Sequence, residues 1–540
     1  MQYRDPFRFG ELIDDLTSVE FLLNITFAGR EYHFSSRPLV LNDEAGRPIQ
    51  FMGGLSLDWT DALNLFNESP TLLALPVALI FEDDIAELVS RGFNLWRAKG
   101  ELSFWVEGRP YEKRIIILRG SVVEPTYGAK NEPVRFSLES NGFDDVNLTH
   151  SPTERLSTQT WPDPLENDLG LYYPIVYGRP GVYSNADGTP QTAPGSPVIV
   201  AKQSNPNPIG IIAKHDVEAT EVTLMNMDRF ASPVTAVTPV VMQTDLLGQK
   251  VATVDLGSGL SWLPGNLVWC IWDRDGGGLL NDTREGTMQG AGELLRYFLR
   301  LSSLEYDEGM FSAIEQYLNQ NYTLASYVDE AVSPWEYIKD NFIPILPLSL
   351  YTNSEGVTAI LWRREATKAE AVGAITTGGG VGRVGPVIYE KQTLVNDIRL
   401  DFAPDSDIVK PQRSVSVIGY KEPDPTTEPD LFSNEYTRAS FFRYGPASLQ
   451  LTSDVIYDAS TAINVLQWKS RALSLPYRVI EYDVPIRLGF LVRGDLILLT
   501  DPEIHLFDYL CFVRDIKWSD GKPRLVLVLV DDPPRENRLG

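Results

Sequence analysis

The stretch from Leu488 to Asp501 reads Leu-Gly-Phe-Leu-Val-Arg-Gly-Asp-Leu-Ile-Leu-Leu-Thr-Asp, a turn followed by an apolar strand. It lies within Thr452–Val530, which opens with a predicted helix over Asp454–Leu473 and a turn at Leu475-Pro476. Short strands follow at Tyr477–Val484, Asp495–Thr500, Tyr509–Trp518 and Arg524–Val530. Short strands that close on themselves, with a helix on one side, predict a small barrel.

Residues 1–150 predict a second β-barrel-like domain, because alternating apolar and polar residues recur in hairpins. Glu20–Phe27 and Glu31–Phe34 flank the short turn Ala28-Gly29-Arg30. Two further hairpins pair Leu102–Val106 with Lys113–Leu118, and Ser121–Glu124 with Pro133–Glu139. Serial hairpins of this length are typical of barrels and sandwiches.

Residues 151–285 predict a β-rich region that begins with a Pro/Gly-rich crossover. Its segment Tyr173–Gly181 is compact and aromatic, so we expect an ordered crossover that packs against its neighbours. Strands are expected at Pro197–Lys202, Gly210–Lys214, Glu221–Met225, Pro239–Met242 and Lys250–Asp255. Whether the region is a separate domain or part of a barrel stays open at this point.

Residues 286–375 predict a helical α/β insert. Helices are expected at Glu293–Ser303 and Asp307–Tyr322, each with an apolar face. A third begins at Ser333-Pro334, where serine suits the cap and proline suits the first turn. The hairpin of Leu348–Thr352 and Val357–Trp362 ends the insert.

Residues 376–530 predict the C-terminal β-barrel-like domain with one helix. Thr376–Gly380 is expected to be a flexible joint, and residues 531–540 form a tail. Further strands are expected at Asn396–Phe402, Arg413–Gly419 and Phe441–Tyr444. The predicted fold class is a multidomain, β-rich α+β protein, with two small β-barrel-like domains and an inserted helical α/β unit.

Charge and composition exclude several classes of protein. The 540 residues carry 47 Lys plus Arg against 73 Asp plus Glu, a net charge of −26, so the surface repels phosphate and argues against specific nucleic-acid binding. Cys270 and Cys511 allow one disulfide at most. With no signal pattern and no apolar run of about eighteen residues, the chain is expected to be soluble and made in the cytoplasm.

Several short motifs invite functional interpretations that their contexts disfavour. The glycines of Gly380–Gly385 fit a dinucleotide loop, but Pro386 and a strand follow instead of the required helix. Arg493-Gly494-Asp495 lies between apolar segments, as a turn between strands does. Asp273–Gly276 lacks the remaining oxygen ligands of a calcium loop. The four histidines show no metal-ligand spacing: His33, His150, His215 and His505. We therefore predict no catalytic, cofactor or metal site.

Three tryptophans crowd one stretch: Trp262, Trp269 and Trp272. Buried packing or a subunit interface is the favoured interpretation, because large aromatic residues dominate cores and interfaces. Sugars also stack on exposed aromatic residues, which leaves carbohydrate binding as the alternative.

Dispersed segments give the chain a resemblance to the tail hub (baseplate hub) proteins of tailed bacteriophages. At the N-terminus these segments are Phe27–Phe34, Arg114–Val122 and Glu132–Ser140. At the C-terminus they are Ser474–Val479, Leu488-Gly489, Gly494-Asp495 and Thr500-Asp501-Pro502. The helical unit, which ends in a hairpin and Trp362-Arg363-Arg364, resembles the inserted domain of such hubs.

The resemblance implies a structural, non-enzymatic virion protein of the tail tip or baseplate, without a cofactor. It implies a homotrimer whose two barrel-like domains per subunit build a pseudo-sixfold ring, which adapts the hexameric tail tube to a threefold tip. The implied partners are the distal tail or tail tube protein, the tape measure protein, and tail fibre or tip proteins, with DNA passing through the lumen. The alternatives are a carbohydrate-binding or carbohydrate-cleaving tail component that recognises the host surface, and another β-rich structural virion protein.

Overall fold

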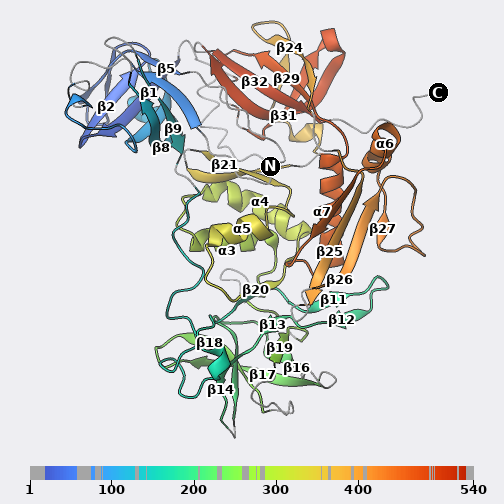
Figure 1. The fold of residues 1–540 in the computed structure, drawn as a ribbon. Coiled ribbons are helices and arrows are strands. Elements are labelled where there is room, and N and C mark those ends of the chain that lie inside the picture. Colours follow the sequence, from blue (N-terminus) through green and yellow to red (C-terminus); the bar gives the residue numbers. More distant parts are fainter. Residues whose placement is uncertain are drawn as a thin grey trace.

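The fold is a set of β-sheets arranged around a helical layer (Figure 1). The computed structural model describes residues 19–57, 74–79, 87, 89–127, 133–140, 143–204, 207–227, 234–257, 267–274, 276–279, 286–353, 355–362, 366–390, 394–405, 410–485, 488, 491, 493–519 and 522–530. The expected tail at residues 531–540 lies outside this set, as do Trp262, Asp275 and Arg363-Arg364. No helix among the described residues is long and apolar enough to cross a membrane.

The N-terminal sheet has seven strands and is nearly closed. Its order is β2 (Arg30–Ser35), β1 (Val19–Phe27), β7 (Lys99–Val106), β8 (Ile115–Thr126), β9 (Val134–Ser140), β6 (Ala74–Leu79) and β5 (Leu55–Leu57). Met52, just before β5, donates its N–H to His33 O of β2 at 2.8 Å, so the two outer strands approach each other. The hairpin of β3 (Leu39–Asn42) and β4 (Pro48–Phe51) connects β2 to β5.

The C-terminal sheet closes through a glycine turn. Its order is β23 (Gly373–Thr376), β30 (Leu496–Asp501), β31 (Leu506–Ser519), β32 (Lys522–Leu529), β29 (Arg478–Asp483) and β24 (Gly382–Tyr389). The outermost strands β23 and β24 are consecutive in the chain, so a short link must hold the two edges close together. In that link, Gly378, Gly379 and Gly380 all have positive φ, which favours glycine. The expected flexible joint is therefore the turn that closes this barrel.

A third barrel-like sheet lies at the far end of the molecule, below the helices in Figure 1. Its order is β13 (Ser196–Pro197), β19 (Leu267–Ile271), β16 (Glu221–Met227), β17 (Val234–Thr244), β18 (Lys250–Asp255), β15 (Ile209–Ala213) and β14 (Ile199–Lys202). Its outermost strands β13 and β14 are separated only by Val198, so this sheet also curls until its edges meet. The predicted β-rich class with barrel-like sheets is confirmed.

The helical layer joins these sheets. It contains α3 (Ala291–Leu301), α4 (Glu308–Asn321), α5 (Pro334–Asn341) and the hairpin of β21 (Leu348–Asn353) and β22 (Gly356–Leu361). The predicted cap at Ser333 is confirmed, because its side chain accepts from Glu336 N–H. Asp307 also caps its helix, accepting from Met310 N–H. Two short strand pairs cross beside this layer, β10 (Ile175–Tyr177) with β20 (Ser326–Val328), and β11 (Val182–Ser184) with β12 (Pro190–Thr192).

A four-stranded sheet packs against the same helices. It contains β27 (Leu431–Phe432), β26 (Lys410–Ile418), β25 (Asp397–Asp405) and β28 (Ser448–Thr452), with α6 (Glu435–Tyr444) and α7 (Ala459–Leu473). Short 3-10 turns complete the elements, at Tyr111–Lys113, Glu166–Asp168, Lys368–Glu370 and Pro502–Ile504.

Two expectations for the C-terminal part differ from the structure. The predicted helix, observed as α7, does not pack on the barrel: Trp468 donates to Ile345 O at 2.7 Å and Asn464 donates to Asn321 O at 2.8 Å, which attaches α7 to the helical layer. The predicted strand Phe441–Tyr444 is the end of α6. Its aromatic residues suggest a strand, but Asn434 caps the preceding turns by accepting from Thr437 N–H at 2.9 Å.

Candidate functional site

Two features of the fold are candidates for function, and the first is the contact between the N- and C-terminal barrels. One continuous hydrophobic cluster contains side chains of both, including Leu23 and Leu138 from the first and Ile480 and Leu527 from the second. All four are at most 1% exposed. The third barrel has separate clusters of its own. Apolar side chains of the first and last barrels therefore belong to one cluster, although the rest of the chain separates the two barrels in sequence.

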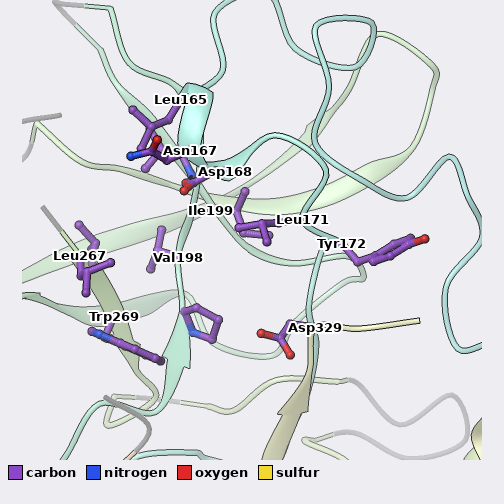
Figure 2. Close-up of a pocket in the computed structure, with 13 residues that line it drawn as sticks. Leu165, Asn167, Asp168, Leu171, Tyr172, Val198, Ile199, Leu267, Trp269 and Asp329 are labelled. Carbon is purple, nitrogen blue, oxygen red and sulfur yellow. Dashed lines mark hydrogen bonds between the residues drawn. The ribbon is translucent and has the colours of Figure 1, made fainter. Parts of the chain in front are cut away.

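The second feature is a cavity of about 170 Å³ between the third barrel and the crossover (Figure 2). Most of its wall is apolar and comes from β13, β14, β19 and the segment before β10. The lining residues are Leu165, Asn167, Asp168, Leu171, Tyr172, Pro197, Val198, Ile199, Val200, Leu267, Val268, Trp269 and Asp329.

Regular elements position the polar groups of this cavity. Asp168 ends the 3-10 turn Glu166–Asp168, and its Oδ2 accepts from Val200 N–H of β14 at 2.7 Å. Asp329 directly follows β20. Trp269 lies in β19, where it pairs with Met225 on one side and Pro197 on the other. Figure 2 shows the side chains of Asp168, Asp329 and Trp269 around Val198.

Burial has the largest influence on the pKa values of the two carboxyl groups in the cavity. It raises the pKa of Asp168, against the opposing effect of the Val200 N–H. It also raises the pKa of Asp329, with a further contribution from the charge of Glu330 and an opposing one from the residue's own backbone N–H. No cation in the described part of the chain is among the groups that shift either pKa. Burial therefore makes both carboxyl groups harder to ionise than they would be in water.

The two described tryptophans of the cluster differ in burial. Trp272 is fully buried and donates from Nε1 to Ser196 Oγ at 3.0 Å, as expected for a core residue. Trp269 is half-buried and lines the cavity. Trp262 lies outside the described residues.

The short motifs have structural roles. Gly380–Gly385 forms a turn and the start of β24, with no helix behind it. Arg493 is buried against Asp515, with Nη2 to Oδ1 at 2.9 Å, so the Arg-Gly-Asp tripeptide is not displayed. Asp273 contacts its neighbour Arg274 at 3.8 Å. No group of three potential metal-ligating side chains occurs among the described residues. Both cysteines are buried free thiols.

Two of the histidines form hydrogen bonds with the backbone of the crossover. His150 Nε2 bonds to Tyr173 O at 2.9 Å, and His215 Nε2 accepts from Val176 N–H at 3.0 Å. Burial, as the largest cause, lowers the pKa of each to about 4. Both are therefore neutral at pH 7.

The sequence does not single out Asp168 or Asp329. Each is an isolated carboxylate among 73 acidic residues, and the two lie in different predicted domains. The pairing of β10 with β20 brings together the segments that contain Asp168 and Asp329, and no local sequence pattern predicts that pairing. Trp269 is the only lining residue that sequence reasoning marked.

Comparison with known proteins finds similarity to solved structures only; no protein-family model and no curated protein matches the chain. The 43 kDa tail protein of prophage MuSo2 from Shewanella oneidensis is 10% identical, with 94% of this chain and 98% of that chain covered and a TM-score of 0.38. A chain of the virion of a native gene transfer agent particle is 16% identical, covers 53% and 85%, and has a TM-score of 0.20. A chain of the p2 virion baseplate in its activated conformation is 12% identical, covers 67% and 100%, and has a TM-score of 0.19.

These neighbours are tail, virion and baseplate proteins, the kind of protein that the sequence resembles. The three TM-scores lie below 0.5.

Proposed function

We propose that the chain is a structural hub protein of a phage tail tip or baseplate, which assembles as a homotrimer. The observation that carries the proposal is the single hydrophobic cluster shared by the N- and C-terminal barrels. Two similar barrels held side by side in each subunit give six similar units in a trimer. Such a ring matches a sixfold tube on one side and a threefold tip on the other.

Each of these barrels presents exposed aromatic residues that suit a contact between subunits. Trp96 of the N-terminal barrel is 55% exposed. Phe93, three residues earlier in the chain, is also exposed, as is Tyr127, whose hydroxyl group forms hydrogen bonds with Leu95 N–H and Asn94 Oδ1. Tyr389 of β24 in the C-terminal barrel is 62% exposed beside Ile388. Exposed aromatic residues are typical anchors of protein interfaces. In the proposed ring, the Trp96 surface of one subunit faces the Tyr389 surface of the next.

The acidic surplus fits a channel through which DNA leaves. A net charge of −26 repels the phosphate backbone, so DNA would pass without adhering. The proposed partners are those of a hub, namely the tail tube or distal tail protein, the tape measure protein, and fibre or tip proteins. The proposed role requires no catalysis.

The mass of the purified protein tests this proposal. We expect a particle three times the 60.4 kDa of one chain in mass photometry, and a ring in electron micrographs. Trp96→Asp and Tyr389→Asp should each weaken assembly by roughly 30-fold or more, as loss of an interface anchor does. Leu246→Asp, at a 67% exposed site of the third barrel, is the matched control and should leave the trimer intact. A wild-type protein that stays monomeric at micromolar concentration would refute the trimer.

A further inference from the structure

The cavity beside the third barrel combines hydrogen-bond donors and acceptors in a largely apolar wall. The donors are the indole N–H of Trp269, the amide of Asn167 and the hydroxyl of Tyr172. The acceptors are the carboxyl groups of Asp168 and Asp329. The remaining lining side chains are those of leucine, isoleucine, valine and proline. A ligand that fits this wall must therefore donate and accept hydrogen bonds, and must also present an apolar face.

Trp269 contributes both a flat apolar surface and a donor. Figure 2 shows its indole ring on one side of Val198 and the carboxyl group of Asp329 on the other. Its Nε1 is buried and has no hydrogen-bond partner in the described part of the chain. A buried donor without an acceptor is unfavourable, so a ligand oxygen that reaches Nε1 would stabilise the site.

The wall chemistry separates the possible ligand classes. An anion is repelled by Asp168 and Asp329, and an apolar group leaves the polar groups of the wall unpaired. A guanidinium or ammonium group donates but does not accept, so it cannot pair with the indole N–H of Trp269. A hydroxyl group does both. A pyranose carries several hydroxyls around a ring whose C–H groups form an apolar face, and such a face can stack on an indole.

The size of the cavity also suits a single sugar ring. Its volume of about 170 Å³ admits on the order of ten water-sized groups, which is close to the ring and hydroxyl atoms of one hexose. Leu171 and Leu267 belong to the wall and are exposed, so the cavity opens to solvent. A glycan chain could therefore continue outward from a bound ring.

We propose that this cavity binds one uncharged hexopyranose unit, either a free sugar or part of a glycan. Its apolar face lies against Trp269, and its hydroxyls donate to Asp168 and Asp329 and accept from Asn167 and the indole N–H. The site is independent of the proposed trimer, because its lining comes from the third barrel, the crossover and the residue after β20, and includes no residue of the paired barrels.

Saturation-transfer NMR on the full chain tests the proposal with the methyl pyranosides of glucose, galactose, mannose and N-acetylglucosamine. At least one should bind with a Kd in the roughly millimolar range, because a single ring makes few contacts. Sorbitol has the hydroxyls of glucose but no ring, and it should bind at least about 10-fold more weakly, since it loses more internal rotation. Glucuronate should also bind more weakly, because its carboxylate is repelled by Asp168 and Asp329.

The source of the sugar is read from a second titration. A disaccharide that contains the preferred unit should bind at least as tightly as the methyl pyranoside if the cavity serves a glycan chain. It should bind more weakly if the cavity accepts only a free sugar.

Variants of the wall separate the ring contact from the hydrogen bonds. Trp269→Ala should weaken sugar binding by at least about 10-fold, whereas Trp269→Phe keeps an aromatic surface and should weaken it by about 3-fold. Asp329→Asn and Asp168→Asn should each weaken it by about 10-fold, because a neutral amide is a poorer acceptor than a carboxylate. Asparagine at position 168 retains an acceptor for Val200 N–H, so this change should not unfold the turn.

Matched variants control for folding and for nonspecific effects. Asp187→Asn removes a carboxylate from an exposed turn, and Trp96→Ala removes an exposed tryptophan from the N-terminal barrel. Both should bind the sugar like the wild type. All variants should keep the melting temperature of the wild type within a few degrees.

Several outcomes would overturn the proposal. Absence of transfer to all four methyl pyranosides at concentrations on the order of 50 mM would exclude a sugar site. Equal binding of sorbitol would show that no ring is recognised. Tighter binding of N-acetyl-arginine amide would assign the cavity to a cation, and tighter binding of adenosine would assign it to a nucleoside. Sugar binding that survives Trp269→Ala and Asp329→Asn unchanged would place the ligand elsewhere. The oligomer mass, measured separately, reports on the trimer and not on this site.

Discussion

The paired barrels and the third barrel are built alike but are attached to the molecule differently. The N- and C-terminal barrels share one hydrophobic cluster, so they are joined by apolar packing. The third barrel meets the crossover through apolar packing, in which Tyr173 and Val176 lie among barrel residues, and also through polar contacts. Among these polar contacts are His215 to Val176 and Lys214 to Glu154 at 2.9 Å. Apolar packing is insensitive to pH, whereas buried histidines are not. Of the two junctions, the one at the crossover is therefore expected to respond to acid, because it contains His150 and His215.

The largest expected loss of stability comes from truncating a matched core leucine in each region. Leu527→Ala in the shared cluster and Leu224→Ala in the third barrel remove the same atoms from sites at most 1% exposed. Each should cost roughly 2–5 kcal/mol of local stability. Hydrogen exchange should show Leu527→Ala loosening both paired barrels and Leu224→Ala loosening only the third. Protection loss confined to the C-terminal barrel in Leu527→Ala would contradict the shared core.

A smaller effect is expected from acid. His150 and His215 have folded pKa values of about 4, below the unfolded value near 6.5. The unfolded state therefore binds more protons, and stability is lost as the pH falls from about 6.5 toward 4. For the fully buried His150 this loss is on the order of 3 kcal/mol.

Hydrogen exchange at pH 7 and pH 5 locates this loss. Peptides that contain residues 149–177 should exchange faster at pH 5, while peptides of the paired barrels should change little. His150→Gln should reduce the difference between the two pH values. Equal acceleration throughout the molecule would mean that the junction has no special sensitivity to acid.

The smallest effect concerns the seam of the C-terminal barrel. Arg383 of β24 contacts the buried Asp501 of β30 at 3.3 Å, and Tyr482 O–H also donates to Asp501 at 2.7 Å. Arg383→Met removes one partner of a buried carboxylate, which keeps the Tyr482 hydroxyl and the Glu503 N–H, and should cost about 1–2 kcal/mol. Arg119→Met, at a 53% exposed site of the N-terminal barrel, should cost less than about 1 kcal/mol. Equal melting temperatures for the two variants would show that the seam adds no stability.

Sequence reasoning succeeded where the signal is local. The strands Tyr477–Val484 and Arg524–Val530 follow from β-branched and apolar runs, and each is observed within two residues of its predicted limits. The predicted cap at Ser333 is correct because a cap involves only a few consecutive residues. The helix α6 was missed because its aromatic end resembles a strand, although Asn434 carries a capping signal. The predicted domain limits and the functional hub role stay predictions.

The sequence by itself determined the β-rich class, most strands and helices, and the net negative charge. These depend on residues close together in the chain or on composition. Only the tertiary structure decided that the first and last barrels share a core, that α7 joins the helical layer, and that Asp168 and Asp329 line one cavity. Each of these arises where apolar surfaces and strand edges from distant segments meet, and burial there, not local pattern, sets the contacts and the pKa values.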